Sequence, residues 1–180
     1  MLEAKEEKTR KQAINIKNLI NLVKKMLIKI LAIGKINNSP YKEIFDLYYK
    51  RVKWNIIIKE LEIKASSKKI SEKIIIEKEE KLLLENIPND YIVIGLDLNG
   101  QNISTEVFSK IINNYREDSA KICFIIGGAS GFGQKIKKRA NHIIAFGKIT
   151  LPHLMARCVL IEQIYRSFTI ATNHPYHSGH

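Results

Sequence analysis

Cysteine is scarce in this sequence, and its absence elsewhere excludes several kinds of protein. Cys123 and Cys158 are the only two cysteines among 180 residues. One lies in a strand-like apolar run and the other in a helix-like run, so we expect both thiols to be buried. Two such cysteines provide neither a disulfide framework nor a thiolate metal site. We therefore expect a cytoplasmic protein.

Membrane and secretion signals are also missing. Hydrophobic residues make up 45% of the chain, which is the usual value for a globular protein and argues against both a disordered and a membrane protein. Lys29 interrupts the first apolar stretch and no small-residue cleavage site follows, which argues against a signal peptide. We interpret residues 1–25 as a basic N-terminal extension, either flexible or a misassigned start ahead of Met26, and residues 26–180 as one domain.

Familiar nucleotide and zinc signatures are absent. The glycine loop at residues 127–133 lacks the Gly-Lys-Ser/Thr ending of a P-loop and the GxGxxG spacing, which argues against ATP and NAD. A tight turn before a helix remains the simplest alternative for this loop. His174, His177 and His180 match no common zinc spacing and have no acid or cysteine nearby, so we expect no metal.

Basic residues are in clear excess over acidic ones. The chain has 30 Lys and Arg against 18 Asp and Glu, a formal net charge of +12 and a pI near 9.6. Such an excess indicates a polyanionic partner, with nucleic acid ahead of a membrane surface. A proteome rich in Lys and Ile would give the same charge, so composition alone leaves that alternative open.

The order of apolar runs predicts an α/β fold. A strand at 27–33, a helix at 40–52, a strand at 54–63 and a helical stretch at 68–85 come first. Three short apolar runs follow at 91–96, 122–126 and 143–146, each ahead of a loop and a helical segment (104–115, 134–140 and 152–168). Uninterrupted runs that alternate with helices are typical of a mainly parallel sheet with helices on both faces.

Two of the predicted helices have informative faces. In the segment 40–52, Ile44, Leu47 and Tyr48 share one face, which we expect to point at the core. The segment 152–168 is apolar nearly all round, which is typical of a helix buried on most sides. Burying a helix on most of its sides is hard to achieve in a monomer of this size. We therefore predict a homodimer interface on this helix.

Three loops follow the predicted strands at residues 97–100, 127–133 and 147–152. Parallel strands bring such loops to one edge of the sheet, where open α/β proteins bind their ligands. Glycine in these loops lets the backbone approach a ligand closely. We expect a binding site at this edge.

The C-terminal segment places polar side chains in an otherwise apolar stretch. His153, Arg157, Arg166, Tyr176 and His177 are the candidates. Buried polar groups need partners, so such a segment indicates a site rather than a plain terminus. For His153 a structural role and a substrate contact are equally open, and Arg166 with the acid four residues before it also fits an ordinary surface pair.

Read together, these segments resemble the SPOUT-class methyltransferases, specifically the rRNA large-subunit methyltransferase H family. The matching stretches are LAIGK at 31–35, LDLNG at 96–100, FIIGGASG at 124–131, TLPH at 150–153 with Arg157, EQIYR at 162–166 and HPYH at 174–177. Six motifs in the right order and spacing cover residues 26 to the end, although no single one would suffice.

The resemblance implies a deep C-terminal trefoil knot, an exception to the rule that chains do not thread. It implies a homodimer with the active site near the subunit interface, and S-adenosyl-L-methionine as cofactor. It also implies methyl transfer to N3 of a pseudouridine in 23S rRNA on the assembled ribosome.

Carried over by position, the cofactor contacts fall on residues of the three loops: Leu96, Gly127, Phe146, Gly147, Lys148, Ile149, Thr150 and Leu151, with Gly128 adjacent. An imide N3 must lose a proton, so a base or a group that stabilises the anion is needed. The candidates are His153 or His177 for the proton, Arg157 or Arg166 for negative charge, and Tyr176 for positioning.

Two other functions remain open at this stage. One is a non-catalytic ribosome- or RNA-binding module of the same fold, which the charge supports equally well. The other is a SPOUT methyltransferase that acts on tRNA.

Overall fold

The computed structural model describes residues 26–37, 39–63 and 71–177. The predicted N-terminal extension, residues 1–25, lies outside the described residues, as do residues 38, 64–70 and 178–180. His180 and the start of the helical stretch predicted at 68–85 therefore also lie outside them.

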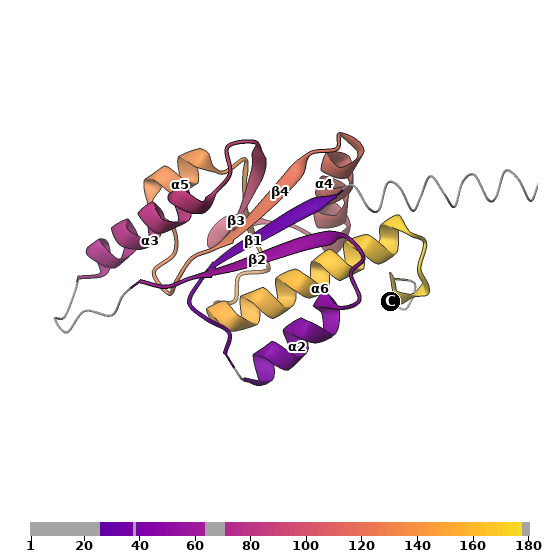
Figure 1. Cartoon of the computed structure of the whole chain (residues 1–180), viewed down its shortest axis with the longest axis horizontal. Helices are drawn as coiled ribbons and strands as arrows, with labels where there is room; N and C mark the ends of the chain where they lie inside the picture. The colour runs from indigo at the N-terminus through magenta and orange to yellow at the C-terminus, as the bar shows by residue number, and fades with distance from the viewer. Residues whose placement is uncertain (1–25, 38, 64–70, 178–180) are drawn as a thin grey trace, which may run out of the picture.

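Five strands form one sheet in the order β2-β1-β4-β3-β5 (Figure 1). They are β1 Leu27–Ile33, β2 Asn55–Leu61, β3 Tyr91–Asn102, β4 Lys121–Ile126 and β5 His142–Ala145. All four strand pairings are parallel. The central strand β4 and its neighbour β1 are buried along most of their length, as expected for a parallel sheet covered on both faces. The predicted sheet is confirmed.

Helices cover both faces of the sheet (Figure 1). The helices are α2 Pro40–Tyr49, α3 Glu72–Asn86, α4 Thr105–Glu117, α5 Gln134–Arg139 and α6 His153–Ala171, followed by the short 3-10 helix η1 Pro175–His177. One apolar cluster joins α2, α4 and α6 to the sheet, and a second joins α3 and α5 to its opposite face. Successive residues of β4 alternate between the two clusters, as the period of two in a strand requires.

The predicted face of the first helix is wrong for two of its three residues. Ile44 and Leu47 are 42% and 46% exposed, whereas Phe45 is buried. Tyr41 and Tyr48 also pack against the core. An aromatic ring buries more apolar area than an aliphatic side chain, so the aromatic stripe faces inward and the aliphatic stripe faces out. The helix also ends at Tyr49, before the predicted end at residue 52.

Strand β3 continues beyond the apolar run predicted at 91–96. Leu96 and Gln101 both pair with Ile144 of β5, so residues 97–100 leave the ladder and return to it. A Cβ atom at Gly100 would lie 2.6 Å from the backbone carbon of Ile144, a distance that only glycine avoids. This excursion carries a polar loop out at the carboxyl edge of the sheet.

Helix α6 returns the chain across the sheet beside α2 (Figure 1). Its buried residues include Cys158, Leu160, Ile161, Ile164 and Tyr165. The helix is therefore largely buried within one chain, between α2 and α4. The C-terminal knot implied by the family resemblance stays a prediction.

Candidate functional site

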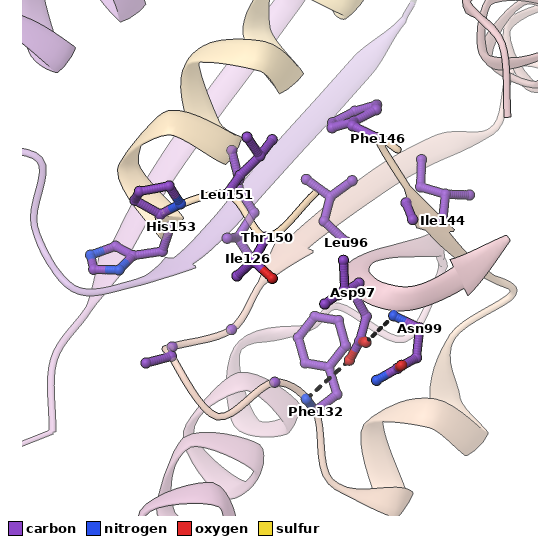
Figure 2. A pocket seen from close by; sticks show the side chains of 18 of the residues that line it. Leu96, Asp97, Asn99, Ile126, Phe132, Ile144, Phe146, Thr150, Leu151 and His153 are labelled. Carbon is purple, nitrogen blue, oxygen red and sulfur yellow. Dashed lines mark hydrogen bonds between the residues drawn. The ribbon is translucent and has the colours of Figure 1, made fainter. Parts of the chain in front are cut away.

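The three predicted loops enclose one cavity of about 530 Å³ at the carboxyl edge of the sheet (Figure 2). They follow β3, β4 and β5, whose parallel direction brings their ends together. Most residues predicted to contact a cofactor line this cavity: Leu96, Gly127, Gly128, Phe146, Gly147, Ile149, Thr150 and Leu151. Lys148 is not among the described residues that line it, although both of its neighbours are.

The strand ends give the cavity an apolar floor. Leu96, Ile126 and Ile144 come from three neighbouring strands, and Phe146 follows directly after β5 (Figure 2). Backbone groups of the glycine-bearing loops form much of the rim. An apolar floor below backbone donors and acceptors suits a ligand that combines a flat ring with polar groups.

Two glycines keep the rim open. Gly147 has a φ of +100°, and no described heavy atom lies within 4 Å of the position of a Cβ there, so its backbone faces free space. At Gly127 a Cβ would lie 3.1 Å from the Phe132 ring, closer than side chains normally pack. Glycine therefore leaves the backbone at residue 147 uncovered and lets the backbone at residue 127 pack against the Phe132 ring.

Asp97 joins two of the loops, a role that sequence reasoning missed. Its carboxylate accepts hydrogen bonds from the backbone N–H of Asn99, at 2.8 Å, and of Phe132, at 3.3 Å (Figure 2). The loop after β3 is thereby tied to the glycine loop after β4. An acidic residue directly after a buried strand was the available signal.

His153 is the only predicted catalytic residue that lines the cavity among the described residues (Figure 2). It lies at the first position of α6, after Pro152. His153 is exposed at the mouth of the cavity. Partial desolvation by its neighbours, and then the positive charge of Arg157, lower the pKa of its imidazole. Its imidazole is therefore neutral at neutral pH and able to accept a proton.

Arg157 lies one turn further along α6 and is 2% exposed. Its Nη2 donates to the carbonyl oxygens of Ile33 and Gly34, and its Nη1 donates to Glu60 Oε1 at 3.0 Å. The residue thus ties α6 to the carboxyl ends of β1 and β2. Because these partners occupy both terminal nitrogens, the geometry favours a structural role for Arg157 over a catalytic one.

Arg166 and Tyr176 form a separate cluster at the far end of α6. Arg166 donates to Glu162 Oε1 from both Nε and Nη2, at 3.0 and 2.7 Å. The Tyr176 hydroxyl donates to the same oxygen at 3.2 Å, and its ring lies 5.0 Å from the Arg166 guanidinium. The pair of Arg166 with Glu162 is half-buried and networked, unlike an ordinary surface pair. His177 follows in η1.

The described part of the chain contains neither a cluster of metal ligands nor a helix that could span a membrane. Among residues 26–37, 39–63 and 71–177, no three His, Cys, Asp or Glu gather to hold a metal ion. The helices described there are too short or too polar to cross a membrane.

Replacing Arg157 by Met should lower the free energy of unfolding by about 3 kcal/mol, because a buried ion pair loses one partner and two carbonyls lose their donor. Urea denaturation measures this loss. Lys42→Met, which breaks the more exposed pair with Asp46, is the control and should cost less than about 1 kcal/mol. Equal losses in both variants would contradict the structural role.

Comparisons with known proteins agree with this architecture. A family model described as "Predicted SPOUT methyltransferase" matches residues 26–177. Proteins named "Ribosomal RNA large subunit methyltransferase H" are 36% identical in Rhodospirillum centenum and 40% identical in Clostridium botulinum, over 84% of this chain and 99% of each relative. A probable methyltransferase from Bordetella pertussis has a similar fold, with a TM-score of 0.50 at 7% identity over 84% of this chain and 99% of that one. With its parallel sheet and its cavity between three post-strand loops, the chain belongs to the SPOUT methyltransferase family.

Proposed function

We propose that this methyltransferase transfers a methyl group from S-adenosyl-L-methionine to N3 of a pseudouridine in 23S rRNA, on the assembled ribosome. The observation that carries the proposal is the cavity between the three loops, in a chain of this family. The relatives named for large-subunit rRNA match along nearly their whole length, which supports 23S rRNA over tRNA as the substrate. The net charge of +12 suits a polyanionic substrate. A protein that acts on assembled ribosomes would work in the cytoplasm.

The residues around the cavity fit S-adenosyl-L-methionine, which supplies an electrophilic methyl group when bound. Leu96, Ile126 and Ile144 would cover a flat ring, and the backbone at Gly127 and at residues 146–151 would hold polar groups. Lys148 belongs to that run and would contribute through its backbone. Holding the reacting groups in line supplies much of the rate in such a displacement.

His153 is the best-placed group to take the proton from N3. It lines the cavity and its lowered pKa keeps the imidazole neutral. Arg166, Tyr176 and His177 belong to the opposite end of the chain's last segment. Arg166 lies 13 residues beyond His153 on α6, about 20 Å along the helix. We infer that these residues act on RNA or on the cavity of a second copy.

A homodimer would bring that end of α6 to a second cavity. Met155 and Val159 are half-buried and stand outside the apolar core cluster of one chain. On the neighbouring helix α2, Ile44 and Leu47 are exposed. These four apolar side chains lie on two helices that pack together, and we call them the α2–α6 patch. We infer that a twofold contact covers them.

Methylation mapping tests the proposal directly. The purified chain, given S-adenosyl-L-methionine and assembled ribosomes, should add one methyl group at N3 of a pseudouridine in 23S rRNA, detected by mass spectrometry of RNA fragments. Purified tRNA is the parallel substrate and should stay unmodified. A methyl group on tRNA alone would favour the tRNA alternative, and calorimetry without binding of S-adenosyl-L-methionine would favour the non-catalytic one.

Replacing His153 by Gln should lower the single-turnover rate by about 10²-fold, because a general base contributes on that order. In the unchanged protein the rate should be full at neutral pH and fall only as the pH drops through the lowered pKa of His153, below the ordinary histidine value. The variant should lose that acidic limb.

His142→Gln is the matched control, because His142 is not among the described residues that line the cavity. Its ring forms a hydrogen bond of 2.7 Å with the Tyr115 hydroxyl. It should keep both rate and pH profile. A His153→Gln variant with an unchanged rate and profile would remove His153 from the mechanism.

Replacing Val159 by Asp should convert a dimer into a monomer, because it puts an unpaired charge in the α2–α6 patch. Sedimentation equilibrium at micromolar concentration measures the mass. Ile74→Asp, at an exposed position of α3 on the other face of the sheet, should stay dimeric. An unchanged protein that sediments as a monomer would contradict the proposed dimer.

A further inference from the structure

Two adjacent carboxylates of α3 are buried against the glycine loop after β4. Glu79 and Glu80 are only 6% and 8% exposed, although α3 is otherwise a charged helix with an exposed outer face. Acidic residues are almost never buried unless they are paired. The partners of both carboxylates are backbone N–H groups, and all of these lie in or directly after the loop at residues 127–133.

Glu80 caps a helix that cannot cap itself. Its Oε1 accepts hydrogen bonds from the backbone N–H of Lys135, at 2.6 Å, and of Ile136, at 3.0 Å. These are the second and third residues of α5, whose N-cap position is Gly133. Helices usually satisfy such N–H groups with a side chain at the N-cap, which glycine lacks. Here a side chain 55 residues earlier in the sequence does so.

Glu79 holds the opposite end of the loop. Its Oε2 accepts a hydrogen bond from the backbone N–H of Gly128, at 3.1 Å. Gly128 lines the cavity, so this bond acts on the site itself. Burial raises the pKa of Glu79, and the Gly128 N–H works against that rise by stabilising the carboxylate.

The two glycines leave room for the carboxylates in the positions that they occupy. A Cβ at Gly128 would overlap the Glu79 carboxylate, and a Cβ at Gly133 would overlap that of Glu80. Gly133 has a φ of −71°, which any residue adopts, so backbone freedom does not require glycine there. The loop and the two carboxylates therefore fit each other closely at both ends.

We propose that Glu79 and Glu80 are positioning residues that hold residues 127–133 in the conformation that binds S-adenosyl-L-methionine. The inference rests on the proposed function for the identity of the ligand. The hydrogen bonds themselves do not depend on the ligand, because they join α3 to residues of the chain alone. The bonds reach the loop from α3, which is not among the described lining of the cavity.

Four variants and one control test whether Glu79 and Glu80 position the loop. Glu79→Ala and Glu80→Ala should each raise the dissociation constant for S-adenosyl-L-methionine at least about tenfold in calorimetry, because a charged hydrogen bond to the loop is lost. Glu79→Gln and Glu80→Gln should stay within a few-fold of the unchanged protein, since an amide oxygen accepts from the same N–H groups. Glu77→Ala, at an exposed position of the same helix, should bind normally.

Amide hydrogen exchange gives a second readout that needs no ligand. In the alanine variants, protection should fall at Gly128 for Glu79 and at Lys135 and Ile136 for Glu80, while the amides of β4 stay protected. Steady-state kinetics should show a raised KM for S-adenosyl-L-methionine and an unchanged KM for RNA. If an alanine variant fails to fold, Glu79→Asp or Glu80→Asp carries the test instead, because the shorter side chain draws the carboxylate away from the same N–H groups. Cofactor binding and amide protection should fall in the aspartate variant, and normal values for both would overturn the proposal.

The fit between Gly133 and Glu80 allows a double-mutant cycle. Gly133→Ala should weaken cofactor binding in the unchanged protein and have a smaller effect in the Glu80→Ala background, where the overlapping carboxylate is gone. Additive effects, or alanine variants that bind within twofold of Glu77→Ala with normal exchange, would overturn the proposed positioning role. In a different outcome, the unchanged protein binds no S-adenosyl-L-methionine while the alanine variants still lose protection at the predicted amides. That result would overturn the proposed function and leave the positioning role of Glu79 and Glu80 intact.

Discussion

Five parallel strands place their carboxyl ends at one edge of the sheet, and the candidate site depends on this directional constraint. Each of the five strands ends at this edge, and the loops that follow the last three strands line a single cavity. No one loop is long enough to enclose a ligand. Their convergence follows from strand direction alone, which is why three short segments far apart in the sequence can share one pocket.

Irregular backbone at this edge needs support, and charged side chains provide it, three of them buried and one half-buried. Asp97, Glu79 and Glu80 accept hydrogen bonds from loop N–H groups, and Arg157 donates to carbonyl oxygens at the end of β1. Glu79, Glu80 and Arg157 are buried, and fixed backbone dipoles or an opposite charge compensate their loss of water. The division is regular: acids hold the loops that present N–H groups, and the arginine holds a turn that presents C=O groups.

The same arrangement separates two tasks along α6. Its first turn brings His153 to the cavity, and its last turns carry the cluster of Glu162, Arg166 and Tyr176. A helix of 19 residues keeps these ends apart in one chain. If the chain pairs through the α2–α6 patch, the second copy supplies what a single cavity lacks, and the polar C-terminal segment becomes part of a composite site.

The order of strands and helices along the chain, the parallel sheet and the position of the three loops were predictable from the sequence by itself. They follow from local periodicity and from the rule that parallel strands end together. Only the tertiary structure decided which face of α2 points inward, that Arg157 is buried against Glu60, and that Glu79 and Glu80 reach the glycine loop. These contacts join residues 49 to 97 positions apart, so no local pattern encodes them. A charged residue in a helix has the same sequence pattern whether it faces solvent or a loop that follows a distant strand. Only the packing of helices and strands determines which of these it contacts.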